Sequence, residues 1–107
     1  MQTMARISRA DAVDLLRHCL EDGEVILGPH FRKALADERL NFADTWRVMR
    51  SGTIYDEPEL DTKFGEWKYR IEGHEPGGNW LCIVFSFKTI ERAFLITCWT
   101  VEARRKR

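Results

Sequence analysis

The N-terminal part of the chain shows helical spacing of its apolar residues. Ser8, a common N-cap residue, stands three positions before Asp11. The apolar positions that follow share one helical face: Val13, Leu16 and Leu20. This pattern predicts a helix over about residues 9–22 that ends at Gly23.

Two further helices are predicted before residue 53. Gly28-Pro29 favours a helix over about 29–38, because proline suits the first helical turn. Asn41 followed by Asp44 is a capping pattern for a third helix, which ends at Ser51-Gly52. The apolar faces of these helices are Phe31, Ala34 and Leu35 in the second, and Phe42, Trp46 and Met49 in the third.

In the second half of the chain, apolar and charged residues alternate with a period of two. Residues 66–72 alternate, which places the apolar side chains on one face of a strand and the charged side chains on the other. The apolar set, predicted to meet the core, is Trp67, Tyr69 and Ile71, and the charged set is Glu66, Lys68, Arg70 and Glu72. Buried strands are predicted over residues 80–88 and 94–101 from their β-branched and aromatic content.

These elements predict an α+β fold, with N-terminal helices packed on one face of a three- to four-stranded antiparallel sheet. Residues 53–55 are the candidate fourth, edge strand, and residues 56–61 are predicted to be an acidic loop. Residues 1–103 are predicted to form a single domain, followed by a basic tail over 104–107.

Composition narrows the class of protein. The 107 residues carry 17 basic and 17 acidic side chains, so the formal charge is zero, yet all four residues of the tail are basic and the remainder has a charge of −4. This distribution argues against broad, non-specific nucleic-acid binding. No apolar run approaches the roughly 20 residues of a membrane span, no secretory pattern opens the chain, and the three cysteines form no CxxC pair. We therefore expect a soluble, cytoplasmic protein.

The candidate chemistry lies in cationic and imidazole side chains. No metal-binding or phosphate-loop motif occurs, so no cofactor or metal is predicted. His30 lies in the first turn of the second predicted helix, where backbone N–H groups favour an anion and an imidazole can transfer a proton. Lys68 and Arg70, two positions apart, project from one sheet face as a phosphate clamp requires. This set suits metal-independent RNA cleavage by 2′-OH attack, which needs a base, an acid and cations.

Simpler interpretations of the same residues stay open. Lys68 and Arg70 can be a solvated face that pairs with Glu66 and Glu72. His30 can simply orient a helix start. Arg32 flanks it in the second helix, and Arg39 can pair with a neighbouring acid: Asp37, Glu38 or Asp44. The four tryptophans favour core packing, with one of them available for base stacking, and His74 lies in a turn with no assigned role.

The order of these predicted elements and motifs resembles that of a known protein family. The stretch from His30 to Gly52 has a leading histidine, a helix closed by Glu38-Arg39, a short loop and a second helix. With the strands that contain Tyr69–Gly73, Gly78–Val84 and Leu95–Thr100, it is similar to small prokaryotic toxin-like domains related to the BrnT and RelE/ParE-type toxins. Those toxins are grouped with the barnase-EndoU-colicin-RelE ribonuclease fold. The resemblance covers about residues 8–101.

The resemblance implies a metal-independent endoribonuclease of a toxin–antitoxin module. By position, it implies catalytic roles for His30, Lys68 and Arg70, and substrate-binding roles for Arg39 and for Thr97 or Thr100 on the last strand. Arg32, a cation of the second predicted helix, is a further candidate for substrate binding. The implied partners are RNA, free or ribosome-bound, and a cognate antitoxin protein, with homo-oligomers also compatible. The alternative, favoured by the balanced charge, is a non-catalytic protein-binding module of the same fold that uses a sheet edge or aromatic patch.

Overall fold

The structure of the protein is a computed structural model, of which residues 4–101 are described here. Within that range the chain forms three helices and five strands in the order α1 (Arg9–Glu21), β1 (Glu24–Leu27), α2 (Pro29–Asp37), α3 (Phe42–Ser51), β2 (Glu59–Asp61), β3 (Glu66–His74), β4 (Trp80–Thr89) and β5 (Arg92–Val101). The predicted basic tail over 104–107 lies outside the described residues. No helix in the described range is long and apolar enough to cross a membrane.

The three predicted helices are confirmed to within one residue, because their end signals are local. The Ser8 hydroxyl accepts a hydrogen bond from the Asp11 backbone N–H at 3.1 Å. Asn41 and Asp44 form a reciprocal capping box at the start of α3. Gly28 is the N-cap of α2, and Pro29 occupies its first turn.

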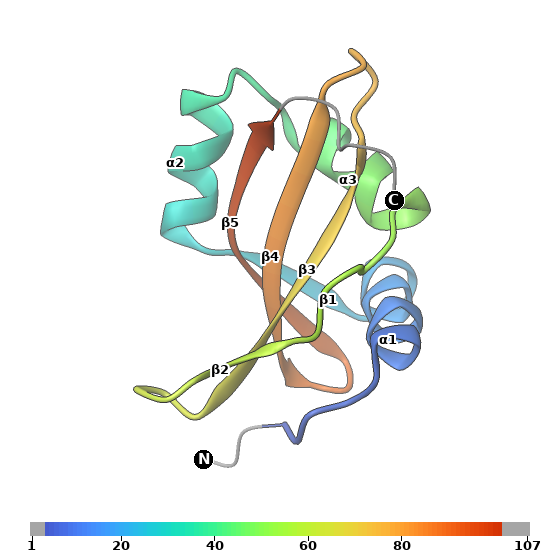
Figure 1. The fold of residues 1–107 in the computed structure, drawn as a ribbon, viewed down its shortest axis with the longest axis vertical. Helices are drawn as coiled ribbons and strands as arrows, with labels where there is room; N and C mark the ends of the chain where they lie inside the picture. Colours follow the sequence, from blue (N-terminus) through green and yellow to red (C-terminus); the bar gives the residue numbers. More distant parts are fainter. Residues whose placement is uncertain (1–3, 102–107) are drawn as a thin grey trace.

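The strands form one mixed sheet in the order β1-β5-β4-β3-β2, with the helices packed on one of its faces (Figure 1). The predicted α+β class is confirmed, but the prediction of three to four antiparallel strands is wrong. Five strands are present among the described residues, and β1 runs parallel to β5. The β1 segment is only four residues long and lies between two helices, so its pattern is too short to distinguish from a linker.

The edge of the sheet beyond β3 also differs from the prediction. Residues 59–61, predicted as part of an acidic loop, form β2 and pair with β3. Residues 53–55, predicted as an edge strand, contribute only an isolated bridge between Thr53 and Glu72. Charged side chains are typical of short edge strands, because such strands keep one side in water.

The hydrophobic core lies between the helices and the adjacent face of the sheet. Its fully buried side chains include Leu16 of α1, Phe31 of α2 and Met49 of α3, packed on Ile71 and Phe85 of the sheet. Tyr69 and Ile71 reach this core as their alternation predicts, and Trp67 packs partly against it. No helix of residues 4–101 covers the opposite face, here called the open face (Figure 1). Strand alternation places the charged side chains of β3 on this open face.

Candidate functional site

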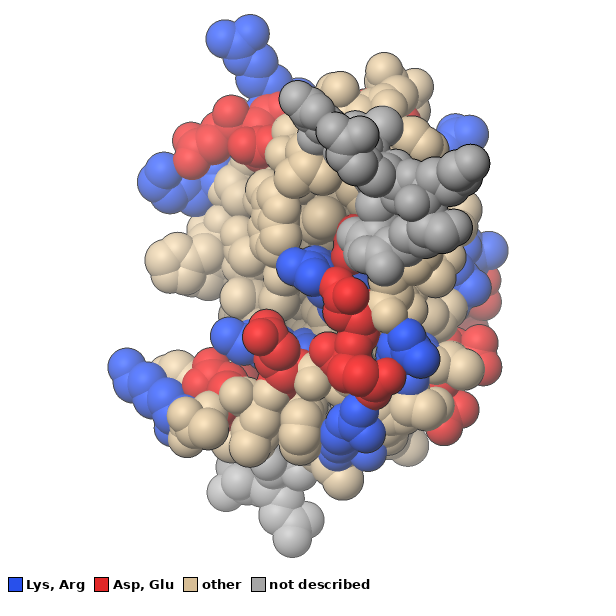
Figure 2. All heavy atoms as spheres, viewed as in Figure 1, with Lys and Arg blue, Asp and Glu red and all other residues tan. Residues whose placement is uncertain are grey.

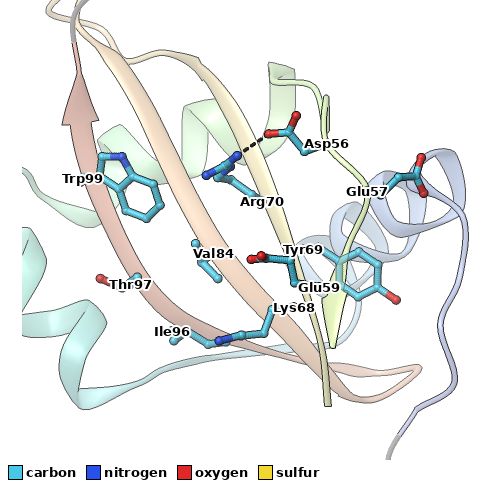
Figure 3. A pocket seen from close by; sticks show the side chains of 10 residues that line it. All are labelled: Asp56, Glu57, Glu59, Lys68, Tyr69, Arg70, Val84, Ile96, Thr97 and Trp99. Atoms are coloured by element: carbon cyan, nitrogen blue, oxygen red, sulfur yellow. Dashed lines mark hydrogen bonds and ion pairs between the residues drawn. The ribbon is translucent and has the colours of Figure 1, made fainter. Parts of the chain in front are cut away.

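A pocket of about 360 Å³ lies on the open face, across β3, β4 and β5. Two predicted cations, Lys68 and Arg70, line it from β3, and the predicted Thr97 lines it from β5 (Figure 3). The remaining lining residues are Val84, Tyr69, Ile96, Trp99 and the three acidic residues Asp56, Glu57 and Glu59. The sequence-based expectation that Lys68 and Arg70 share one face is therefore confirmed, and they share it with a tryptophan.

A bulge in β5 decides which threonine reaches this pocket. Val84 pairs with Thr97, but the next residue of β4 pairs with Leu95, so Ile96 is the extra residue. Leu95 and Cys98 are both buried on the core side, and Ile96 and Thr97 between them both line the pocket. Thr97 therefore lies in the pocket that Lys68 and Arg70 line. In a regular strand, Ile96 and Thr97 would point to opposite faces of the sheet.

Acidic side chains compensate the cations of the pocket. The Arg70 guanidinium donates a hydrogen bond to Asp56, and its Nε lies 3.2 Å from Oε2 of Glu72. The hydrogen bond to Asp56, with a smaller attraction from Glu72, raises the pKa of Arg70 above its ordinary value. Lys68 Nζ lies 3.8 Å from Asp61. Both β3 cations therefore pair with acids, but of the two partners predicted for them only Glu72 is used, by Arg70, whereas Lys68 pairs with Asp61 and Glu66 pairs with Lys88.

Glu72 is buried, which corrects its predicted place on a solvated strand face. Its side chain has 0% exposure, and its Oε1 accepts a hydrogen bond from Trp80 Nε1 at 3.0 Å. Tyr55 packs against the Trp80 ring with 6.2 Å between the ring centroids. The alternation rule correctly gives the face of Glu72, but this carboxylate is buried and accepts a hydrogen bond from Trp80 instead of facing water.

The structure separates the other predicted site residues from the pocket. His30 is exposed in the first turn of α2, and Arg32 Nε donates to the Leu27 carbonyl at 3.1 Å. Arg39 is an exposed residue with φ of 57° just after α2. The Thr100 backbone N–H donates to Glu38 Oε1 at 2.8 Å, so Thr100 faces α2. None of these four lines the pocket, because α2 packs on the side of β5 that faces the core.

The acidic side chains are the pocket residues that the sequence reasoning did not select. The space-filling view shows Asp and Glu side chains gathered beside Lys and Arg on the open face (Figure 2). Glu59 lies beside Lys68, its cross-strand neighbour, whereas Glu57 points away from the other labelled side chains (Figure 3). The sequence feature that could have identified them is the run of acidic residues over 56–61. Its relation to the pocket is visible only in the structure, where β2 pairs with β3.

Cys19, Cys82 and Cys98 are buried thiols without disulfides, and burial raises the pKa of Cys19 and of Cys98 to about 11. The described residues contain no group of three His, Cys, Asp or Glu side chains placed to hold a metal ion.

Comparison of the chain with models of protein families, with curated proteins and with solved structures finds no match. The fold and the pocket geometry are therefore the basis for a functional proposal.

Proposed function

We propose that the protein is the toxin component of a toxin–antitoxin module, a metal-independent endoribonuclease with a RelE/BrnT-like fold. One observation carries this proposal: two cations, a tryptophan, a threonine and carboxylates converge in a single pocket on the open face. An aromatic ring beside cations is typical of single-stranded nucleic-acid sites, because the ring stacks on a base while the cations attract phosphate.

The pocket contains the groups that transesterification of RNA needs. In this proposal Arg70 exchanges Asp56 for the substrate phosphate, and Trp99 stacks on an adjacent base. The Glu59 carboxylate takes the proton of the 2′-OH, so that His30, the proton-transfer residue predicted from the sequence, has no part in this step. The 2′-oxygen forms a bond to phosphorus as the bond to the 5′-oxygen breaks, and Lys68 donates a proton to that leaving oxygen. The products are a 2′,3′-cyclic phosphate and a 5′-hydroxyl end.

The test is cleavage of single-stranded RNA by the full chain in EDTA, with the end groups identified by mass spectrometry. Glu59→Gln and Lys68→Ala are expected to lose roughly 100-fold or more in rate. Lys33→Ala is the matched control, because Lys33 is an exposed cation on α2 that pairs with Asp37 outside the pocket. His30→Ala is expected to keep full activity. Absence of cleavage, or cleavage indifferent to Glu59 and Lys68, would reject this proposal.

A second candidate function is a protein-binding module, favoured by a different observation. Leu60 on β2 and Phe64 in the turn that follows it are 46% and 63% exposed. Apolar side chains on a short edge strand are typical of partner-binding edges. The two functions are compatible if the partner is an antitoxin. Coexpression with the adjacent gene product tests this: Leu60→Asp with Phe64→Asp should abolish copurification, and unchanged copurification would reject this edge as the interface.

A further inference from the structure

A second pocket of about 370 Å³ lies at the other end of β3. Arg47 and Ser51 of α3 line it, together with Tyr55, His74 and Trp80, and the buried Glu72 separates it from Arg70 and the first pocket. Strand alternation places His74 on the same face of β3 as Lys68 and Arg70. Four residues of extended strand put His74 about 13 Å from Arg70 along β3.

His74 is held in one orientation by two contacts. Its Nδ1 lies 3.1 Å from the Gly78 carbonyl oxygen, and because a carbonyl only accepts, Nδ1 carries the proton. Its ring packs edge-on against Trp80, with centroids 4.9 Å apart and an interplanar angle of 89°. The remaining nitrogen, Nε2, is therefore the one that a ligand would meet, and it donates a hydrogen bond once the ring is protonated.

The charged residues that line this second pocket favour an anion more than those that line the first pocket. Three carboxylates line the first pocket, against two cations. Here the described lining contains a single carboxylate, Glu72, whose oxygens face Trp80 Nε1 at 3.0 Å and Arg70 Nε at 3.2 Å. Arg47 is an exposed cation that lines the pocket.

We propose that this pocket is a second anion site, in which Arg47 and the Nε2 of His74 bind a phosphate group. In the simplest case the group belongs to the RNA strand that enters the first pocket, one or more nucleotides from the cleaved bond. The identification with RNA rests on the proposed function, but the binding of phosphate does not. Arg47, the imidazole of His74 and the aromatic rings of Tyr55 and Trp80 all line this pocket, and this combination suits a phosphate attached to a nucleoside.

The experiment uses the histidine NMR signals of the full chain, which has three histidines. Histidine-to-glutamine variants assign the signals, and inorganic phosphate is titrated at about pH 6 and constant ionic strength, where histidines begin to carry charge. The His74 signals are expected to move with saturation, and Arg47→Gln should weaken binding roughly tenfold. Arg50→Gln is the matched control, because Arg50 also lies on α3 but pairs with Glu21. Static His74 signals, or equal binding by Arg47→Gln, would overturn the site.

A second titration, with a 2′-O-methyl RNA oligonucleotide that cannot be cleaved by 2′-OH attack, separates the two sources of phosphate. Movement of the same His74 signals at lower concentration than inorganic phosphate supports an RNA phosphate. Movement with inorganic phosphate alone would overturn the RNA assignment and leave a site for a free phosphate. If the protein cleaves no RNA but His74 still responds to phosphate, the proposed function fails and the anion site stands. If the protein cleaves RNA while the His74 signals stay static, the proposed function stands and the anion site fails.

Discussion

Removal of the Glu72 side chain should be among the most destabilising single changes in the sheet. The side chain is fully buried, its Oε1 accepts from Trp80 Nε1 at 3.0 Å, and its Oε2 lies 3.2 Å from Arg70 Nε. Glu72→Ala leaves the Trp80 N–H without this acceptor and Arg70 without one of its two carboxylates. A lost buried charge-assisted hydrogen bond costs about 1.5–3 kcal/mol, and a broken buried ion pair about 3–5 kcal/mol.

The lower part of this combined range is the better expectation. The Arg70 side chain is 39% exposed and keeps Asp56 as a partner, so solvent screens part of the lost attraction. We expect Glu72→Ala to lower the free energy of unfolding by about 2–3 kcal/mol, and to lower Tm by about 10 °C or more. Urea unfolding followed by tryptophan fluorescence measures the first quantity, and calorimetry the second.

Glu57→Ala is the control for Glu72→Ala. Glu57 also pairs with arginines, Arg6 and Arg9, but its side chain is 60% exposed. Its removal should change stability by less than about 1 kcal/mol. A Trp80→Phe background should reduce the effect of Glu72→Ala, because the hydrogen bond that the mutation removes is then already absent. Equal effects of Glu72→Ala and Glu57→Ala would refute the reasoning.

Three further outcomes are expected from local features. A hydrogen bond to Glu91 and the electrostatic attraction of its carboxylate raise the pKa of His18 above its ordinary 6.5. Protonated His18 therefore stabilises the fold below about pH 6.5, and this contribution is lost as the pH rises through the folded pKa. His18→Gln should therefore lower Tm more at about pH 5.5 than at about pH 9; an effect independent of pH would contradict this. Burial holds the thiol pKa of Cys19 and Cys98 at about 11, so iodoacetamide at about pH 8 should label them far more slowly in native protein than in urea, as mass spectrometry would show. Asn41→Ala should cost about 1 kcal/mol in urea unfolding through loss of the capping box, whereas Asn41→Ser should retain most of the stability.

The helices were predictable because their determinants lie within a few residues of each other. The capping pair Asn41 and Asp44 binds the backbone of its own first turn, so no distant part of the chain is needed to recognise the start of α3. The same locality holds for the alternation of β3, which placed Lys68 and Arg70 on one face. The helix that carries His30 was equally predictable, but its position relative to β3 was not, because that depends on which face of the sheet it packs against.

The sequence by itself determined three helices, the long strands and the shared face of two cations, because periodicity and capping are properties of neighbouring residues. Tertiary structure alone decided three further features: β1 parallel to β5, the bulge that turns Thr97 into the pocket and Thr100 toward α2, and the burial of Glu72 with its hydrogen bond from Trp80. Each depends on pairing between segments far apart in the chain. Strand register and packing settle such contacts, and a single extra residue in β5 is enough to change which side chains meet.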